Sequence, residues 1–198
     1  YYQGTWKGTQ ALDGGGALMN QSIHAVDAIA WLAGTSMGLN AHETPVTEVH
    51  AYTDVRAHNP ANVEVEDTAV AALQYRDGTL GHILGTTAAY LGTRRRLRVA
   101  GRDGTIEVAG DELVHWQFRE EQPEDEEIRA SFGDDEEGGT SDPMAIDYEK
   151  HTRNIKAFLD WVDRDAEYLL TGQEARQAVA IIEAIYDSAK TGRPVQLR

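Results

Sequence analysis

The sequence predicts an α+β fold: a largely antiparallel open sheet with helices on one face and the other sheet face used for oligomerisation. Three observations carry this prediction: an apolar-periodic helix near the start, a middle part of short alternating runs separated by turn residues, and two apolar-periodic helices near the end. Because the strands follow one another through short turns, neighbouring strands should pair antiparallel. At 198 residues, the chain is long enough for one domain with a sizeable core.

The first helix is predicted over residues 17–33. Ile23, Val26 and Ala30 fall on one face that can be buried, glycines precede the segment, and Gly34 follows it as a stop signal. This helix should therefore pack on the sheet.

A second face of the same helix is polar. Asn20, His24 and Asp27 follow one another at i, i+4 and i+7, so they share one side. Together with the glycines before it, this line of titratable groups is typical of the wall of a small-molecule site. An ordinary surface helix is the alternative interpretation.

The strands are predicted from alternation and from the turns between them. Asp77-Gly78 and Asp103-Gly104 supply the positive φ angles that tight hairpin turns need. The predicted strands cover residues 46–56, 67–76, 79–89, 94–100, 105–109 and 112–119. Apolar residues on both faces of the second and third strands indicate that another subunit covers the sheet face opposite the helices.

Residues 120–142 carry many carboxylates and are expected to form a solvated excursion from the sheet. A calcium loop is the alternative, but the ordered alternation of an EF-hand loop is absent. Two helices should follow over 146–164 and 172–191. Thr171 can cap the second in a capping box with Glu174, and an edge strand is expected at 195–197.

The charge balance is strongly acidic, with 33 acidic against 18 basic residues and a net charge of −15. Such a surface repels nucleic acid and anionic lipid, so neither is an expected partner. The excess of carboxylates over very few lysines is typical of a halophilic protein, an acidic mesophilic protein being the alternative. The chain contains no cysteine and no run of 18 apolar residues, and a cytoplasmic location is expected.

Several segments, in order along the chain, resemble the Gfo/Idh/MocA oxidoreductases, the family of glucose–fructose oxidoreductase and inositol dehydrogenase. They are the Gly14-Gly15-Gly16 to His24 run, Trp31–Gly34, Glu66–Ala69, Asp77–Gly81, Gly101–Val108 and the tail Ala184–Val195. The resemblance is to the C-terminal domain of these enzymes. It implies that residues 1–198 form a substrate-binding and oligomerisation domain, that a nucleotide-binding Rossmann domain precedes Tyr1, and that the protein forms a homodimer or homotetramer.

The resemblance and the chemistry point to the same histidine. Oxidation of an alcohol by NAD or NADP needs a base for the hydroxyl proton, and His24 stands where the family has the histidine near the reacting hydroxyl. Asn20, Asp27, Trp6 and Lys7 are the predicted substrate-binding residues. The family often has an aspartate at the position of Asn20, so a possible proton-relay carboxylate is missing here.

Gly14, Gly15 and Gly16 are predicted to shape the site through a turn and close packing. They do not form a dinucleotide fingerprint, because Gly-Gly-Gly does not match Gly-x-Gly-x-x-Gly and opens no βαβ unit. The remaining histidines lack metal-ligand spacing, so no metal is expected. The Arg94–Arg98 run is expected to form ion pairs, with an anion site or subunit contact as the alternative.

The sequence therefore predicts the C-terminal domain of an NAD(P)-dependent oxidoreductase that transfers hydride between the cofactor and a sugar or polyol. The isolated fragment should be inactive, because the nucleotide-binding domain would supply most of the cofactor contacts. A non-catalytic carbohydrate-binding or structural oligomerisation module is the alternative.

Overall fold

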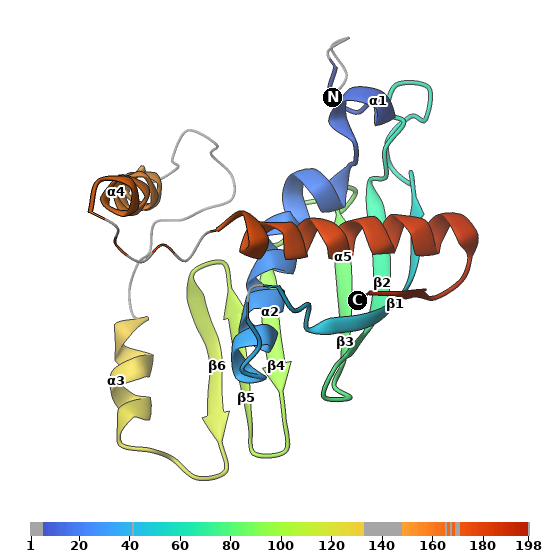
Figure 1. Cartoon of the computed structure of the whole chain (residues 1–198). Coiled ribbons are helices and arrows are strands. Elements are labelled where there is room, and N and C mark those ends of the chain that lie inside the picture. The colour runs from blue at the N-terminus through green and yellow to red at the C-terminus, as the bar shows by residue number, and fades with distance from the viewer. Residues whose placement is uncertain are drawn as a thin grey trace. The chain divides into compact units, whose positions relative to one another are not determined.

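The chain folds into two compact units, which are described separately. The computed structural model describes residues 6–40, 42–132, 148–164, 166, 168 and 171–197. The first unit combines Tyr1–Tyr90 with Leu169–Arg198, and the second consists of Leu91–Tyr168. Figure 1 shows the elements of both units along the chain.

The first unit is built on a four-stranded antiparallel sheet with the order β3-β2-β1-β7. Its strands are β1 (Val46–Asp54), β2 (Thr68–Tyr75), β3 (Leu80–Thr86) and the two-residue edge strand β7 (Val195–Gln196). The predicted hairpin between the second and third strands is present, with Gly78 at a φ of 85°. The last strand of the chain thus pairs with the first.

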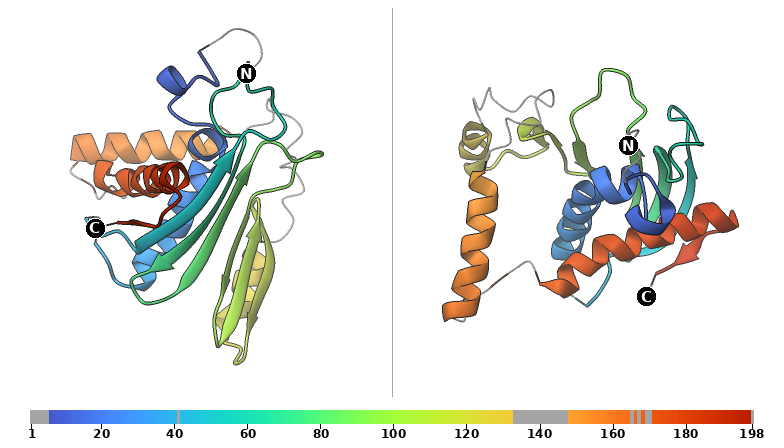
Figure 2. Two further views of the ribbon diagram at one scale, coloured as in Figure 1. Left: turned by 90° about the vertical axis from the view of Figure 1, so that its right-hand side faces the viewer. Right: turned by 90° about the horizontal axis from the view of Figure 1, so that it is seen from above.

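Helices cover one face of this sheet (Figure 2), as the sequence predicts. The helices of the first unit are the short α1 (Gln10–Asp13), the π-helix η1 (Ala17–Ser22), α2 (Ile23–Ser36) and α5 (Gly172–Thr191). α5 packs on β1, while η1 and α2 pack against each other and against α5. The predicted helix over 17–33 is therefore a π-helical turn that continues into an α-helix.

The core of the first unit lies between the sheet and its helices. Every second residue of β2 from Ala69 to Tyr75 is buried, and α5 contributes Ile181, Ile182 and Ile185. Full burial of each of these isoleucine side chains stabilises the fold by about 1.5–3 kcal/mol. Because side chains alternate between the two faces of a strand, this set of β2 residues faces the helices.

The opposite sheet face carries an apolar row. Tyr52, Val70 and Leu84 lie directly across from one another on β1, β2 and β3. They are 70%, 48% and 65% exposed, respectively. The apolar character predicted for both faces of these strands is therefore present.

The second unit contains an antiparallel three-stranded sheet in the order β4-β5-β6 and two helices. Its elements are β4 (Arg96–Ala100), β5 (Gly104–Ala109), β6 (Glu112–Phe118), α3 (Glu124–Ser131) and α4 (Glu149–Arg164). The six long strands match the predicted ones to within a few residues, but they divide into two sheets.

The acidic stretch is partly helical, which the sequence analysis did not predict. Asp125 is buried near the start of α3, where its carboxylate accepts hydrogen bonds from the Gln122 amide at 2.7 Å and from Trp116 Nε1 at 2.7 Å. These bonds, that from Gln122 first, lower the pKa of Asp125. The excursion therefore folds back onto β6 as far as Phe132, and residues 133–142 lie outside the described residues.

Candidate functional site

The candidate site begins at two glycines that allow the chain to approach its neighbours closely. A Cβ atom on Gly16 would collide with the carbonyl group of Glu66, and one on Gly15 would collide with the hydroxyl of Tyr186. Gly14 has a φ of 75° and ends α1. The three glycines thus give a turn and close packing at the entrance to η1.

Glu66 holds the first turn of η1. This residue is only 9% exposed. Its side chain accepts hydrogen bonds from the backbone N–H groups of Gly16 at 2.8 Å and Leu18 at 2.9 Å. Its own carbonyl oxygen accepts from the N–H of Ala17 at 2.9 Å. One residue thus satisfies three successive amides at the start of the helix, where N–H groups lack intrahelical partners.

Tyr186 of α5 completes this arrangement. Its hydroxyl donates to Oε1 of Glu66 at 3.0 Å. Burial raises the pKa of Tyr186 well above its usual value, and the negative charge of Glu66 raises it further. The phenol therefore stays protonated and can donate to the carboxylate.

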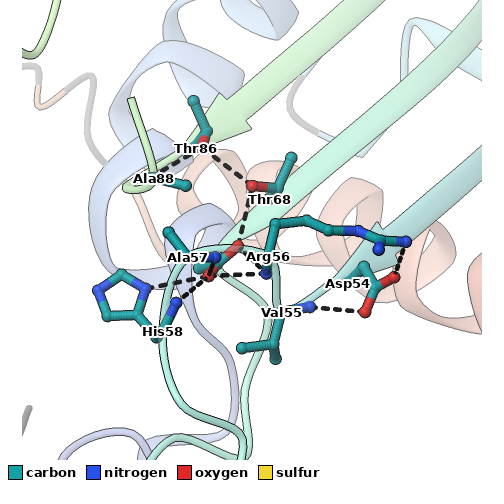
Figure 3. Close-up of polar contacts among 9 residues, drawn as sticks. Asp54, Val55, Arg56, Ala57, His58, Thr68, Thr86 and Ala88 are labelled. Atoms are coloured by element: carbon teal, nitrogen blue, oxygen red, sulfur yellow. Dashed lines mark hydrogen bonds and ion pairs between the residues drawn. The ribbon is translucent and has the colours of Figure 1, made fainter. Parts of the chain in front are cut away.

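Asp67, the next residue, anchors the loop that contains Arg56, Ala57 and His58 (Figure 3). Its carboxylate accepts from the backbone N–H groups of Arg56, Ala57 and His58 at 2.8–3.0 Å, and from the hydroxyl of Thr68 at 2.9 Å. His58 Nδ1 lies 3.0 Å from the same carboxylate. Burial of Asp67 raises its pKa, but these hydrogen bonds, led by that from the His58 amide, outweigh burial and hold the pKa far below the usual range.

Asn20 is tied to the entrance of the helix. Its Nδ2 donates to the carbonyl of Gly15 at 2.8 Å and to Oδ1 of Asp13 at 3.2 Å, while Oδ2 of Asp13 accepts from the N–H of Gly8 at 2.7 Å. Asp13 therefore joins Asn20 to the segment that follows Lys7. Among the described residues Oδ1 of Asn20 has no hydrogen-bond partner, so it is the atom that can accept from a ligand hydroxyl.

His24 and Asp27 lie one helical turn apart on α2, where His24 is exposed and Asp27 is half-buried. Burial raises the pKa of Asp27, and the nearby charge of His24 partly opposes this effect. The charge of His24 therefore acts on the Asp27 carboxyl from one helical turn away.

Trp6 and Lys7 are exposed in the segment before α1. Two bonds from Thr9, one from its N–H and one from its hydroxyl, reach the carbonyl of Trp6. The amide of Gly8, the residue after Lys7, is joined to Asn20 through Asp13, which the sequence analysis did not select. Its position directly before the three glycines is the signal that could have pointed to it.

Glu66 and Tyr186 were also missed as supports of the site. Both stand in segments that carry the family resemblance, but their contacts join residues 48 to 120 positions apart in the chain. Spacing along one helix cannot reveal such pairs.

A metal centre needs a cluster of ligating side chains, and a dinucleotide site of the Rossmann type needs a parallel βαβ unit. Within the described part of the chain, no group of three or more His, Asp or Glu side chains is placed to hold a metal ion. Every described strand pair is antiparallel, so this part of the chain does not contain the parallel βαβ unit that binds a dinucleotide. These residues therefore do not fit as the main holder of a nicotinamide cofactor. None of the helices that the structure describes combines the length and apolar character needed to cross a membrane.

The fold and the candidate site define the class of protein. It is an α+β domain in which a helix with a polar face follows three glycines and lies beside an open antiparallel sheet. Residues 1–197 match the C-terminal alpha/beta domain of the Gfo/Idh/MocA oxidoreductases. The chain belongs to this family.

Solved structures agree with the match. The WlbA dehydrogenase from Bordetella pertussis, in complex with NADH and UDP-GlcNAcA, is 31% identical over 98% of this chain and 51% of its own, with a TM-score of 0.77. The WlbA enzyme from Chromobacterium violaceum, with the same two ligands, is 32% identical over 100% of this chain and 50% of its own, with a TM-score of 0.78. The chain thus spans about half the length of these relatives.

A levoglucosan dehydrogenase in complex with NADH and levoglucosan is 20% identical over 98% of this chain and 53% of its own, with a TM-score of 0.72. At this identity, the likeness shows the fold alone.

Proposed function

We propose that this chain is the substrate-binding domain of a nicotinamide-dependent dehydrogenase that acts on a sugar or polyol. The proposal rests on the start of η1, which is held by hydrogen bonds to Glu66 and Asn20. Asn20, His24 and Asp27 follow from there on one continuous helix, in a chain that belongs to this oxidoreductase family. A nucleotide-binding domain would precede Tyr1, because each of the related dehydrogenases is about twice as long as this chain.

His24 is proposed as the base. When a secondary alcohol is oxidised to a ketone, the carbinol hydrogen leaves as hydride and the hydroxyl hydrogen leaves as a proton. A nicotinamide cofactor, bound mainly by the preceding domain, would supply the hydride acceptor. His24 would accept the proton on an imidazole nitrogen, and the neighbouring charge of Asp27 would stabilise the resulting imidazolium.

The other predicted residues would bind the substrate. Oδ1 of Asn20 would accept a hydrogen bond from a sugar hydroxyl, while its Nδ2 stays bound to the entrance. Trp6 would offer an aromatic face to sugar C–H groups, and Lys7 would donate to hydroxyl or carboxylate oxygens. Because Asn20 carries no charge, it cannot relay a proton, so proton transfer would rest on His24.

The first substrate and cofactor to try are those of the more similar relatives. Both WlbA dehydrogenases, at 31% and 32% identity, were solved with NADH and UDP-GlcNAcA. We therefore propose a nucleotide-linked sugar acid with NAD as the leading pair, and free sugars and polyols with NAD or NADP as the next.

The test is His24→Ala in the full-length enzyme. Loss of a general base should lower kcat by roughly 10²–10⁴-fold with little change in thermal stability. His42→Ala, at another exposed histidine, is the matched control and should retain wild-type turnover. Wild-type turnover in His24→Ala would rule out the proposed base, and a changed subunit assembly without loss of turnover would favour the non-catalytic alternative.

The same domain is proposed to join subunits through the apolar row of Tyr52, Val70 and Leu84, in a homodimer or homotetramer. An exposed apolar sheet face of this kind is typical of a subunit interface. Val70→Asp should reduce the mass measured by light scattering to that of a smaller assembly, whereas an unchanged mass would place the interface elsewhere.

A further inference from the structure

The carboxylate of Glu66 joins the helix entrance to α5, the helix that packs on β1. One oxygen, Oε2, accepts from the N–H of Gly16 at 2.8 Å. The other, Oε1, accepts from the N–H of Leu18 at 2.9 Å and from the hydroxyl of Tyr186 at 3.0 Å. All three partners donate a hydrogen, so the side chain at this position accepts at both of its oxygens, as a glutamate side chain can.

The glycines make this contact specific. A side chain at Gly16 would collide with the backbone of Glu66, so the helix entrance can lie against this residue only where a glycine stands. Gly15, the neighbour whose carbonyl holds Nδ2 of Asn20, is similarly packed against Tyr186. The position of Asn20 therefore depends, through Gly15 and Gly16, on Glu66.

Continuity of the helix extends this dependence. η1 runs without interruption into α2, so the turn that Glu66 holds and the residue His24 belong to one continuous helical segment. A negative charge at the start of the helix also interacts favourably with the N–H groups there, which lack partners within the helix. A displacement of only about 1 Å at a reacting group can cost about 10²-fold in rate.

We propose that Glu66 is a positioning residue of the candidate site: its carboxylate fixes the entrance of η1 and thereby the placement of Asn20 and His24 towards the substrate. The role in turnover rests on the dehydrogenase function proposed above. The role in holding the helix rests on this chain alone.

Glu64 provides a matched control two residues away. Its Oε2 accepts from the N–H of Gln10, the first residue of α1, at 2.9 Å, so it caps a different helix. Glu66→Gln replaces one accepting oxygen by an N–H₂ group that faces a donor, while the shape is kept. Glu64→Gln makes the same change beside α1.

The first measurement is amide hydrogen exchange by NMR on this chain. In Glu66→Gln, the amides of Gly16, Leu18 and Asn20 should exchange at least about tenfold faster, the Asn20 side-chain resonances should shift, and the core amides of Ala51 and Ala71 should keep their rates. Glu64→Gln should leave the rates of Gly16, Leu18 and Asn20 unchanged. Unchanged exchange at Gly16 and Leu18, or the same acceleration in Glu64→Gln, would overturn the proposal.

Uniform acceleration across the core in Glu66→Gln would mean that the carboxylate supports the whole fold and not the helix entrance, which would also overturn it. Tyr186→Phe removes one donor and leaves both amide bonds. It provides a milder variant should Glu66→Gln fail to fold, and a smaller acceleration confined to Gly16–Asn20 is the expected result.

The second measurement is a kinetic comparison in the full-length enzyme. Glu66→Gln should lower kcat by about 10–100-fold with less than about threefold change in KM, and Glu64→Gln should lower kcat by a smaller factor. A wild-type kcat in Glu66→Gln would overturn the positioning role. If the wild-type enzyme oxidises no sugar, the proposed function fails, and the exchange experiment still decides whether Glu66 positions the helix.

Discussion

At the scale of single residues, charge coupling between His24 and Asp27 is the property of the site most open to direct measurement. Burial raises the pKa of Asp27, and His24 acts in the opposite direction. In His24→Ala only the effect of burial remains, so the pKa of Asp27 should rise further. Carboxyl NMR titration of the chain measures this shift, and His82→Ala serves as the control. An unchanged Asp27 titration in His24→Ala would show that the two groups are not coupled.

Asp67 is the residue for which the structure predicts pH-dependent stability. Its folded-state pKa lies below the ordinary value of about 3.9, so its contribution is fully present above that pH and declines as the pH falls towards the folded-state pKa. Asp67→Asn should lower the free energy of unfolding by about 2 kcal/mol at pH 7, because the backbone amides of the loop lose an acceptor.

At pH 3 the difference in the free energy of unfolding between wild type and Asp67→Asn should be about 1 kcal/mol smaller than at pH 7. The reason is that the unfolded wild type binds a proton at this pH and the folded wild type does not. Urea unfolding of both proteins at the two pH values tests this prediction. A difference that grows as the pH falls would have the wrong sign for a stabilised carboxylate.

The sequence predicted which residues of the candidate site share one helix, and missed the residues that hold this helix in place. Asn20, His24 and Asp27 follow from helical periodicity, which relates neighbours within a few turns. Glu66 contacts Gly16 across 50 positions and Tyr186 across 120, and such pairings arise only when the sheet brings the segments together.

At the scale of elements, we call η1 and α2 together the site helix, because they carry Asn20, His24 and Asp27. The first turn of the site helix is π-helical, whereas the sequence predicted a plain α-helix. Single π-helical turns are frequent at functional sites. Here the turn follows Gly16, whose neighbour Ala17 bonds to the Glu66 carbonyl at 2.9 Å. Apolar periodicity is almost the same for both helix types over six residues, so the pattern could not distinguish them.

Two glycines near the ends of the site helix should respond oppositely to the same substitution. Gly16→Ala places a methyl group against the Glu66 backbone and should lower the free energy of unfolding by about 3 kcal/mol. Gly34→Ala, in the last turns of α2, brings the new methyl group within 4 Å of nothing beyond its own helix backbone and chain neighbours, and should stabilise the fold by about 0.5–1 kcal/mol. Chemical denaturation measures both, and equal effects would contradict the close packing at Gly16.

The remaining elements show where local sequence signals are sufficient. α5 has the predicted bounds, because Thr171 caps it by accepting from the Glu174 amide at 3.3 Å and Gly192 ends it with a φ of 66°. α3 was missed, because its mainly charged sequence lacks an apolar face and its start depends on Asp125 bonding to Trp116 of β6. Capping is a local signal, whereas a contact with another element is not.

At the scale of the whole molecule, the net charge of −15 is the dominant electrostatic property. Mutual repulsion among carboxylates opposes folding at low ionic strength, and salt screens it. We predict that the melting temperature rises between low salt and molar KCl. A thermal unfolding series in KCl tests this, and a melting temperature that is flat across the range would remove the halophilic interpretation.

The first unit is assembled from both ends of the chain, and this has a consequence during translation. Its sheet strands β1–β3 leave the ribosome long before α5, which supplies Ile181, Ile182 and Ile185 to the core. Until α5 emerges, the apolar helix-facing side of the nascent sheet lacks part of its cover. The strands of the second unit are contiguous in sequence. This unit can therefore fold before α5 has been synthesised and the first unit is complete.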